Sequence, residues 1–185
     1  METHERQWVL DQFHSSEAHL LELVKGLTPA QWSFREVPDR WSIAEIIEHV
    51  ISVESRLTRA IQKMLQSPAD PDKRPATPVQ DSVLQARVTD RDTKLNAPEQ
   101  VRPAGKWPDT SELMTEFRKT RAATVAFVAE TSAQLRNHFI PHMAFGELDL
   151  YQWLIVLSKH GERHALQIEE IKANPAWPVE SAAVA

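Results

Sequence analysis

The chain of 185 residues contains no cysteine and only four glycines. Without cysteine it can form no disulfide bond, thiolate metal site, iron–sulfur cluster or cysteine nucleophile. Any metal site must therefore use histidine, carboxylate or backbone oxygen ligands. The few glycines also disfavour a nucleotide site in which the backbone closely approaches a phosphate. The sequence contains no glycine-rich phosphate loop, no dinucleotide fingerprint and no G-x-S-x-G motif.

Long apolar runs are also missing. The stretch Trp153–Leu157, with five residues, falls far short of the roughly 20 needed to span a bilayer, so we expect no membrane partner. The first residues are charged, of mixed sign, and precede no apolar segment. We therefore expect no signal peptide and a cytoplasmic protein. The formal net charge of -5 argues against nucleic acid as a partner, because its phosphates are repelled.

Four segments show the apolar periodicity of amphipathic helices. They cover residues 6–25, 42–66, 109–135 and 149–173. Ser42, Asp109 and Asp149 are the predicted N-caps of the last three, and each is followed three residues later by Glu or Gln. Strand signals are nearly absent. The sequence therefore predicts an all-α four-helix bundle as a single domain over 1–173, with 174–185 as a loose C-terminal tail.

The connection between the second and third helices, residues 67–108, is long and irregular. Seven of the 12 prolines fall in it. Four apolar residues at helical spacing predict a short helix within residues 79–95: Val79, Val83, Leu84 and Val88. We predict that this connection covers the bundle and does not add a fifth core helix.

Two histidines on the last predicted helix are the first candidates for chemistry. His160 and His164 are four residues apart and so lie on one side of the helix. At about 100° per residue, His164 falls near the middle of the apolar arc and His160 beside it. A buried imidazole needs a hydrogen-bond partner or a metal, and an i, i+4 pair is a natural bidentate metal platform. A metal site and a pair of hydrogen-bonded core histidines both remain open here.

A third histidine, His49, lies at the edge of the apolar arc of the second helix. Such a residue is by itself more often exposed. Together with the pair, it would complete a three-nitrogen set with open positions, as in catalytic metal sites. Gln167 and Glu45 are candidates to support the ligand rings by hydrogen bonds. A polar helix edge is an equal explanation for Gln167, and helix capping is the better explanation for Glu45.

Other polar residues near these positions carry weaker signals. The stretch HGERH at 160–164 differs from the zinc-protease motif H-E-x-x-H. Glu162 points away from the histidine face, and we predict that it is solvated. His142 precedes the last helix and is a candidate substrate contact at the bundle mouth, although a plain exposed histidine is the better explanation. His19 and His138 belong to no recognisable constellation.

Two stretches resemble signatures of the DinB/YfiT-like superfamily. The first is LTPAQW at 27–32 followed by WSIAEIIEHV at 41–50. The second is PHMAFGEL at 141–148, continued by WL at 153–154 and HGERHALQI at 160–168. The resemblance implies a four-helix bundle with one divalent metal held by His49, His160 and His164, the same three residues that the face analysis selects.

The resemblance also implies a range of functions. The superfamily is described as containing metal-dependent hydrolases, bacillithiol- or mycothiol-dependent S-transferases, and mycothiol-dependent isomerases, often as homodimers. At a site of nitrogen ligands we expect Zn or Ni, with Fe or Mn as alternatives. The resemblance further implies a small-molecule substrate, and a low-molecular-weight thiol where the reaction is a transfer. A metal-bound water or thiol would be the nucleophile. The alternative is a non-catalytic stress-related module whose metal is structural or vestigial.

Overall fold

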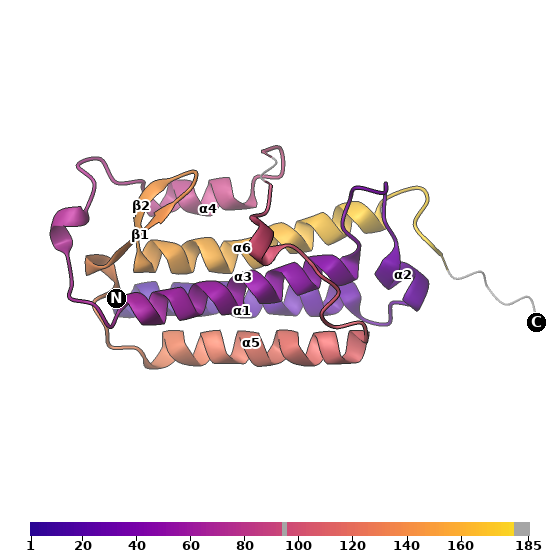
Figure 1. The fold of residues 1–185 in the computed structure, drawn as a ribbon, viewed down its shortest axis with the longest axis horizontal. Helices are drawn as coiled ribbons and strands as arrows, with labels where there is room; N and C mark the ends of the chain where they lie inside the picture. The colour runs from indigo at the N-terminus through magenta and orange to yellow at the C-terminus, as the bar shows by residue number, and fades with distance from the viewer. Residues whose placement is uncertain (94–95, 180–185) are drawn as a thin grey trace, which may run out of the picture.

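The computed structural model describes residues 1–93 and 96–179, and its four long helices lie side by side along one axis (Figure 1). They are α1 (Thr3–Val24), α3 (Ile43–Met64), α5 (Thr110–Glu130) and α6 (Leu150–Lys172). Helices α1 and α3 each pack against both α5 and α6. The predicted four-helix bundle is therefore confirmed. Within the described residues, every helix is too short or too polar to cross a bilayer.

The direction of the helices explains the long connection. Helices α3 and α5 run parallel, because Glu54 contacts Arg121 and Thr58 contacts Thr124 further along both helices. The chain must therefore travel back along the bundle between them (Figure 1). On this path lie the short helices η1 (Pro71–Lys73) and η2 (Glu99–Val101), with α4 (Asp81–Thr89) between them.

Helix α4 is the short helix that the sequence predicts within residues 79–95. Its Leu84 and Val88 are buried and it packs on α6. Val83, from the same apolar set, is 39% exposed and so lies on the outer side. With nine residues, α4 covers the bundle and is not a fifth core helix. Residues 94–95 of the predicted segment lie outside the described residues.

The predicted end of the third long helix is wrong, and a hairpin that the sequence did not predict follows it. Helix α5 ends at Glu130 and not at 135, because the backbone of Thr131 is extended; a 3₁₀ turn, η3 (Leu135–Asn137), follows. Strands β1 (Phe139–His142) and β2 (Gly146–Asp149) then form an antiparallel hairpin, with Ile140 opposite Leu148. Each strand has only four residues, which is too short for a clear alternating pattern. The Trp153 indole N–H fixes the hairpin to α6 by donating to the Ile140 carbonyl.

The residues directly after α6 are docked, so the predicted loose tail is wrong for residues 174–178, whereas Val179 is 80% exposed. The Trp177 ring meets the Phe34 ring edge-on, with 5.5 Å between their centroids. The Gln31 side-chain amide donates to the Pro178 carbonyl at 2.8 Å. Gln31 belongs to α2 (Pro29–Ser33), so this short helix provides the docking surface. Residues 180–185 lie outside the described part of the chain.

A buried ion pair lies at the centre of the bundle between two apolar clusters. Arg121 on α5 donates from Nε and Nη2 to the Glu54 carboxylate at 2.9–3.2 Å, and the side chains are 1% and 3% exposed. Its Nη1 donates to the Phe13 carbonyl at 2.7 Å and to Ser16 Oγ at 3.0 Å. Arg121 therefore joins α5 to α3 and α1.

Helix α6 reaches the same point through a glycine. A Cβ added at Gly161 would lie 3.1 Å from Ser16 Oγ and 3.3 Å from Arg121 Nη2. The absence of a side chain at Gly161 thus lets α6 approach the buried pair, one residue after His160.

Removing one partner of this pair should strongly destabilise the protein. We expect Glu54→Gln to lower the free energy of unfolding by about 3–5 kcal/mol, because the Arg121 charge then stays buried without its counter-charge. Urea denaturation measures the loss. The surface variant Glu116→Gln, which breaks the pair with Lys119 on the same helix, should change stability by less than about 0.5 kcal/mol. Equal effects of the two variants would contradict this assignment.

Helix α6 begins with the capping box that the sequence predicts. The Asp149 carboxylate accepts from the Gln152 backbone N–H at 2.8 Å, and the Gln152 side chain accepts from the Asp149 N–H at 3.2 Å. Asp149 also pairs with Arg136 at 3.1 Å, which links the start of α6 to the preceding segment.

The cap can be separated from the ion pair by two substitutions. Asp149→Ala removes both and should lower the free energy of unfolding by about 1–2 kcal/mol. Asp149→Asn keeps an oxygen acceptor for the Gln152 N–H and loses the charge, so it should lose less. Thermal melts under identical metal conditions compare them, and an unchanged midpoint for Asp149→Ala would show that the cap contributes nothing.

Candidate metal centre

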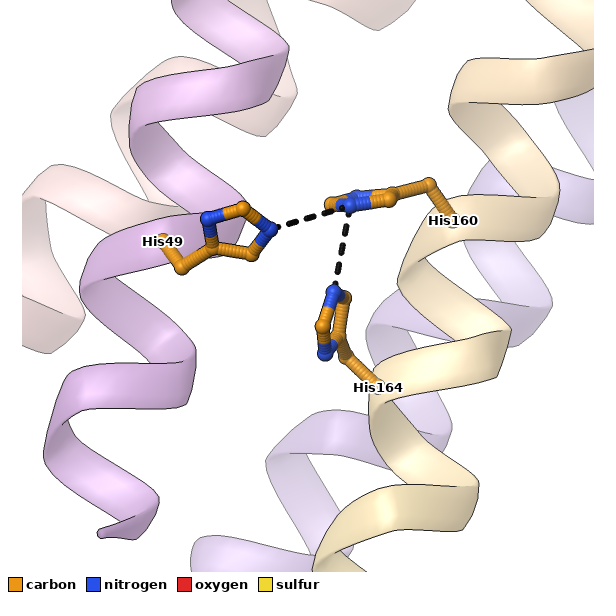
Figure 2. Close-up of side chains that lie close together, drawn as sticks. All are labelled: His49, His160 and His164. Carbon is orange, nitrogen blue, oxygen red and sulfur yellow. Dashed lines mark hydrogen bonds between the residues drawn. The ribbon is translucent and has the colours of Figure 1, made fainter. Parts of the chain in front are cut away.

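Three imidazoles from two facing helices converge inside the bundle (Figure 2). His49 comes from α3, and His160 and His164 come from successive turns of α6. The His160 Nε2 lies 3.2 Å from the Nε2 of His49 and 3.1 Å from that of His164. One nitrogen of each ring falls within 4.8 Å of the other two. His49 and His164 are buried, and His160 is partly exposed.

The outer nitrogens of two of these rings have their own acceptors. His49 Nδ1 lies 2.7 Å from the Val101 carbonyl oxygen, and His164 Nδ1 lies 2.9 Å from Gln167 Oε1. Oxygens of this kind only accept, so each Nδ1 carries the hydrogen. In the neutral rings, the Nε2 lone pairs of His49 and His164 therefore both point toward His160.

This arrangement is poorly satisfied by hydrogen bonds among the three rings. Of the three facing nitrogens, only His160 Nε2 can carry a hydrogen, and it can donate well to just one neighbour. A metal ion accepts all three lone pairs at once. Two nitrogens bound about 2.0–2.1 Å from one ion, at angles of about 90–109°, would lie about 2.8–3.4 Å apart, which matches the two measured separations. The donor set therefore fits one divalent metal ion.

Burial keeps these rings in the form that binds metals. It lowers the pKa of His49 below its ordinary value, against the opposing effect of the hydrogen bond to Val101. Burial and the neighbouring imidazoles lower the pKa values of His160 and His164 well below the ordinary range. All three are thus neutral at neutral pH, and neutral imidazole is the metal-binding form.

Of the two residues that were candidates to support the rings, Gln167 and Glu45, only Gln167 makes a hydrogen bond to one of them. Gln167 contacts His164 directly. Glu45 contacts none of the three histidines: one oxygen accepts the Ser42 N–H at 2.8 Å and the other pairs with Arg35 at 2.6 Å. Glu45 therefore acts in capping α3.

His142, the predicted substrate contact, lies outside the histidine cluster. Its ring packs against Phe145 and Trp153, with centroids 4.7 Å and 5.0 Å away. Trp153 precedes His160 by seven residues, or about 10 Å along the helix. His142 thus belongs to the hairpin and not to the cluster of three histidines.

Glu162 and His19 form a surface contact that the sequence analysis missed. The His19 ring lies 3.4 Å from a Glu162 oxygen on one side and 3.0 Å from a Glu169 oxygen on the other. Glu162 is therefore engaged, and not simply solvated as predicted. His19 lies on α1 and both carboxylates lie on α6, so the sequence spacing gave no signal of this contact.

Glu48 is the residue near the site that sequence reasoning missed most clearly. It directly precedes His49 and is only 5% exposed. Its carboxylate accepts backbone N–H groups from residues that follow η2: Ala104, Gly105 and Lys106. A charged residue inside the apolar run around Ile46 and Ile47 was an available signal, but its partners lie more than 50 residues away.

Two surface hollows lie away from the three histidines. One, of about 320 Å³, lies between α1, α2 and α5 and is lined by Leu21, Trp32 and Met114 among others. The other, of about 390 Å³, lies between α3 and α5 around Gln62 and Phe127. Near the histidines, the Val101 carbonyl lies 2.7 Å from His49 Nδ1 and so places the chain at η2 against one of the three rings.

Comparison with known proteins agrees with this fold. The DinB superfamily family model matches residues 12–168. The chain therefore belongs to the DinB superfamily. It is 27% identical over 149 residues to YuaE of Bacillus subtilis (strain 168), covering 80% of this chain and 88% of that protein.

Two solved structures share the fold at low sequence identity. YfiT from Bacillus subtilis, described as a probable metal-dependent hydrolase with an unusual four-helix bundle topology, matches with a TM-score of 0.66 and 12% identity over 96% of this chain and 91% of YfiT. The four-helix bundle protein TT2238 matches with a TM-score of 0.57 and 20% identity over 89% of this chain and 98% of its own.

The lowered imidazole pKa values predict a loss of stability in acid. Below about pH 6.5 the unfolded chain protonates these histidines while the folded chain does not, so unfolding takes up protons. In metal-free protein, the free energy of unfolding should fall by about 1.4 kcal/mol per pH unit for each imidazole protonated only when unfolded. Urea titrations between pH 7.5 and 5.5 measure the slope.

Two variants identify the source of this slope. His164→Gln removes one such imidazole. The slope of the free energy of unfolding against pH should then decrease by the amount that corresponds to about one proton. The His19 pKa is raised, because bonds to Glu169 and Glu162 outweigh burial. The stability from His19 is therefore present below pH 6.5 and lost above it, and His19→Gln should leave the acid-side loss in place. A wild-type slope insensitive to His164→Gln would contradict the assignment.

Proposed function

We propose that this protein is a metalloenzyme that uses His49, His160 and His164 to hold one divalent metal ion and acts on a small molecule. The observation that carries the proposal is the convergence of three neutral imidazole nitrogens that hydrogen bonds among themselves cannot satisfy. The description of YfiT as a probable metal-dependent hydrolase supports the same class of chemistry. Zn or Ni is the expected ion, with Fe or Mn as alternatives.

The protein groups would divide the work at such a centre. The three imidazoles would hold the ion, and Val101 and Gln167 would fix two of the rings through their Nδ1 hydrogens. Three protein ligands leave coordination positions open for exchange. When bound, the ion would supply Lewis acidity, which lowers the pKa of a water or thiol toward neutrality. With water the reaction is a hydrolysis, and with a low-molecular-weight thiol it is an S-transfer.

One observation favours a second candidate function. His49 and His164 are buried, the Val101 carbonyl lies against His49, and the two hollows described above lie elsewhere. A largely buried centre suits a non-catalytic bundle whose metal is structural. The two candidates differ in whether a small molecule can reach the ion.

Metal content tests the site. Protein reconstituted with Zn or Ni at pH 7.5 and freed of unbound metal should hold about one ion per chain, as measured by mass spectrometry of its metal content. His49→Ala, His160→Ala and His164→Ala should each lose most of the bound metal, because each removes one of three ligands. The loss should be largest for His164→Ala, because His164 lies nearest the middle of the apolar arc of its helix. His142→Ala, outside the cluster, is the control and should bind like wild type. Substoichiometric metal in the wild type would refute the proposal.

Reactivity then separates the candidate functions. Loaded protein is assayed with electrophilic small molecules, with and without bacillithiol or mycothiol, and with ester and amide substrates in water. Thiol-dependent turnover identifies a transferase and thiol-independent turnover a hydrolase. Metal-dependent thermal stabilisation without turnover in either assay favours the structural role.

A further inference from the structure

Residues 96–108, here called the strap, include η2 and lead across the face of α3 toward the start of α5 (Figure 1). The strap is held to α3 at two adjacent places. The Val101 carbonyl accepts from His49 Nδ1 at 2.7 Å. The Glu48 carboxylate accepts from the N–H groups of Ala104, Gly105 and Lys106 at 2.9, 3.0 and 3.2 Å. Consecutive residues of one helix therefore hold both ends of a short stretch of the strap.

At this contact, backbone amides of the strap form an anion-binding site that the Glu48 carboxylate occupies. Three successive N–H groups point at one carboxylate, because the chain turns at Gly105, whose φ is +70°. The carboxylate is removed from water, as Glu48 is only 5% exposed. Charge-assisted hydrogen bonds in such a place are about twice as strong as neutral ones. The strap is therefore firmly fixed where Glu48 holds it.

The position of Glu48 couples this contact to the metal centre. Between Val101 and Ala104 lie only Arg102 and Pro103, and the proline ring fixes one backbone dihedral. A change at the amide contact must therefore move the Val101 carbonyl. That carbonyl is the acceptor that keeps the hydrogen of His49 on Nδ1 and leaves the Nε2 lone pair facing His160.

We propose that Glu48 is a positioning residue of the metal centre. By binding the amides of residues 104–106, it places the Val101 carbonyl on His49 and so fixes the tautomer and orientation of that ligand. The effect on metal affinity rests on the proposed function, whereas the effect on the His49 tautomer does not. The hydrogen bonds of the Glu48 carboxylate go to the strap and not to the histidine rings. Glu48 therefore acts on His49 through the strap.

Metal affinity is the first measurement. Glu48→Ala removes the acceptor of all three amides and should weaken Zn binding by about 10–100-fold, the usual effect of losing a group that orients a ligand. Glu48→Gln keeps one oxygen and should lose less. Gly105→Ala disturbs the same contact from the strap, because alanine disfavours a positive φ, and should resemble Glu48→Ala. Glu45→Gln, one turn earlier on α3, is the matched control and should bind like wild type.

Two measurements on the metal-free protein complete the test. Nitrogen NMR of the imidazole rings at pH 7.5 should show His49 as the Nδ1–H tautomer in wild type and Glu45→Gln, and a mixture in Glu48→Ala and Gly105→Ala. Amide hydrogen exchange at residues 104–106 should accelerate by at least about tenfold in the same two variants. If Glu48→Ala does not fold, Glu48→Gln and Gly105→Ala carry the comparison.

The outcomes separate the two proposals. Faster exchange together with a mixed His49 tautomer supports the role of Glu48, with or without metal binding. Faster exchange with an unchanged tautomer overturns it, because Glu48 then only fixes a loop. If the wild type binds no metal but Glu48→Ala and Gly105→Ala still show the tautomer shift, the proposed function is refuted and the positioning role stands. Unchanged tautomer and exchange in all three variants overturn the positioning role.

Discussion

The guanidinium of Arg121 is the group on which the arrangement of the bundle depends. It bonds to Glu54 of α3 and to Phe13 and Ser16 of α1, and it lies against α6 at Gly161. Apolar side chains tolerate small shifts between helices, but a buried charge does not, because each lost hydrogen bond leaves a polar group dry. We infer that this contact sets the depth and rotation of the four long helices, while the surrounding apolar clusters supply most of the burial.

The spacing of the three histidines depends on that contact. Gly161 lies between His160 and His164 in sequence, and its lack of a Cβ lets α6 sit against Ser16 and Arg121. A shift of α6 there would move both rings together relative to His49, which is fixed on α3. The 3.1–3.2 Å spacing of the imidazole nitrogens thus depends on a contact that no ligand makes itself. Residues that never touch the site can therefore set its geometry.

Local signals predicted much of this structure. The caps at Ser42, Asp109 and Asp149 and the apolar periodicity located the starts of three long helices, since both act within a few residues of the chain. The inward faces of His160 and His164 followed from the same periodicity.

What the sequence did not indicate depends on contacts between distant elements. Arg121 and Glu54 are 67 residues apart, and nothing in either helix shows that the two charges face each other. The hairpin strands have four residues each, so periodicity could not identify them. Glu48 resembled an ordinary charged residue because its three partners are backbone amides of the strap, and backbone groups leave no mark in a sequence pattern. The helix faces and the resemblance both predicted the three histidines, and spacing predicted Gln167 beside His164, but neither indicated Val101 or Glu48.

Orientation of His49 and access of a substrate place opposite requirements on the strap. Orientation of His49 needs the strap closed, whereas a substrate reaching the histidines from that side needs it open. Charged hydrogen bonds contribute about 1.5–3 kcal/mol each, and three bonds to one carboxylate add less than their sum. An opening free energy of about 4 kcal/mol would leave roughly one molecule in a thousand open, and the apparent affinity for a ligand that needs the open state would fall by the same factor. Pro98, Pro103 and Pro108 limit the disorder that the strap gains on opening, which favours the closed form further. A substrate that entered on this side would therefore have to compensate for the lost Glu48 bonds with contacts of its own, and selection among small molecules would then occur at the strap before any reached the three histidines.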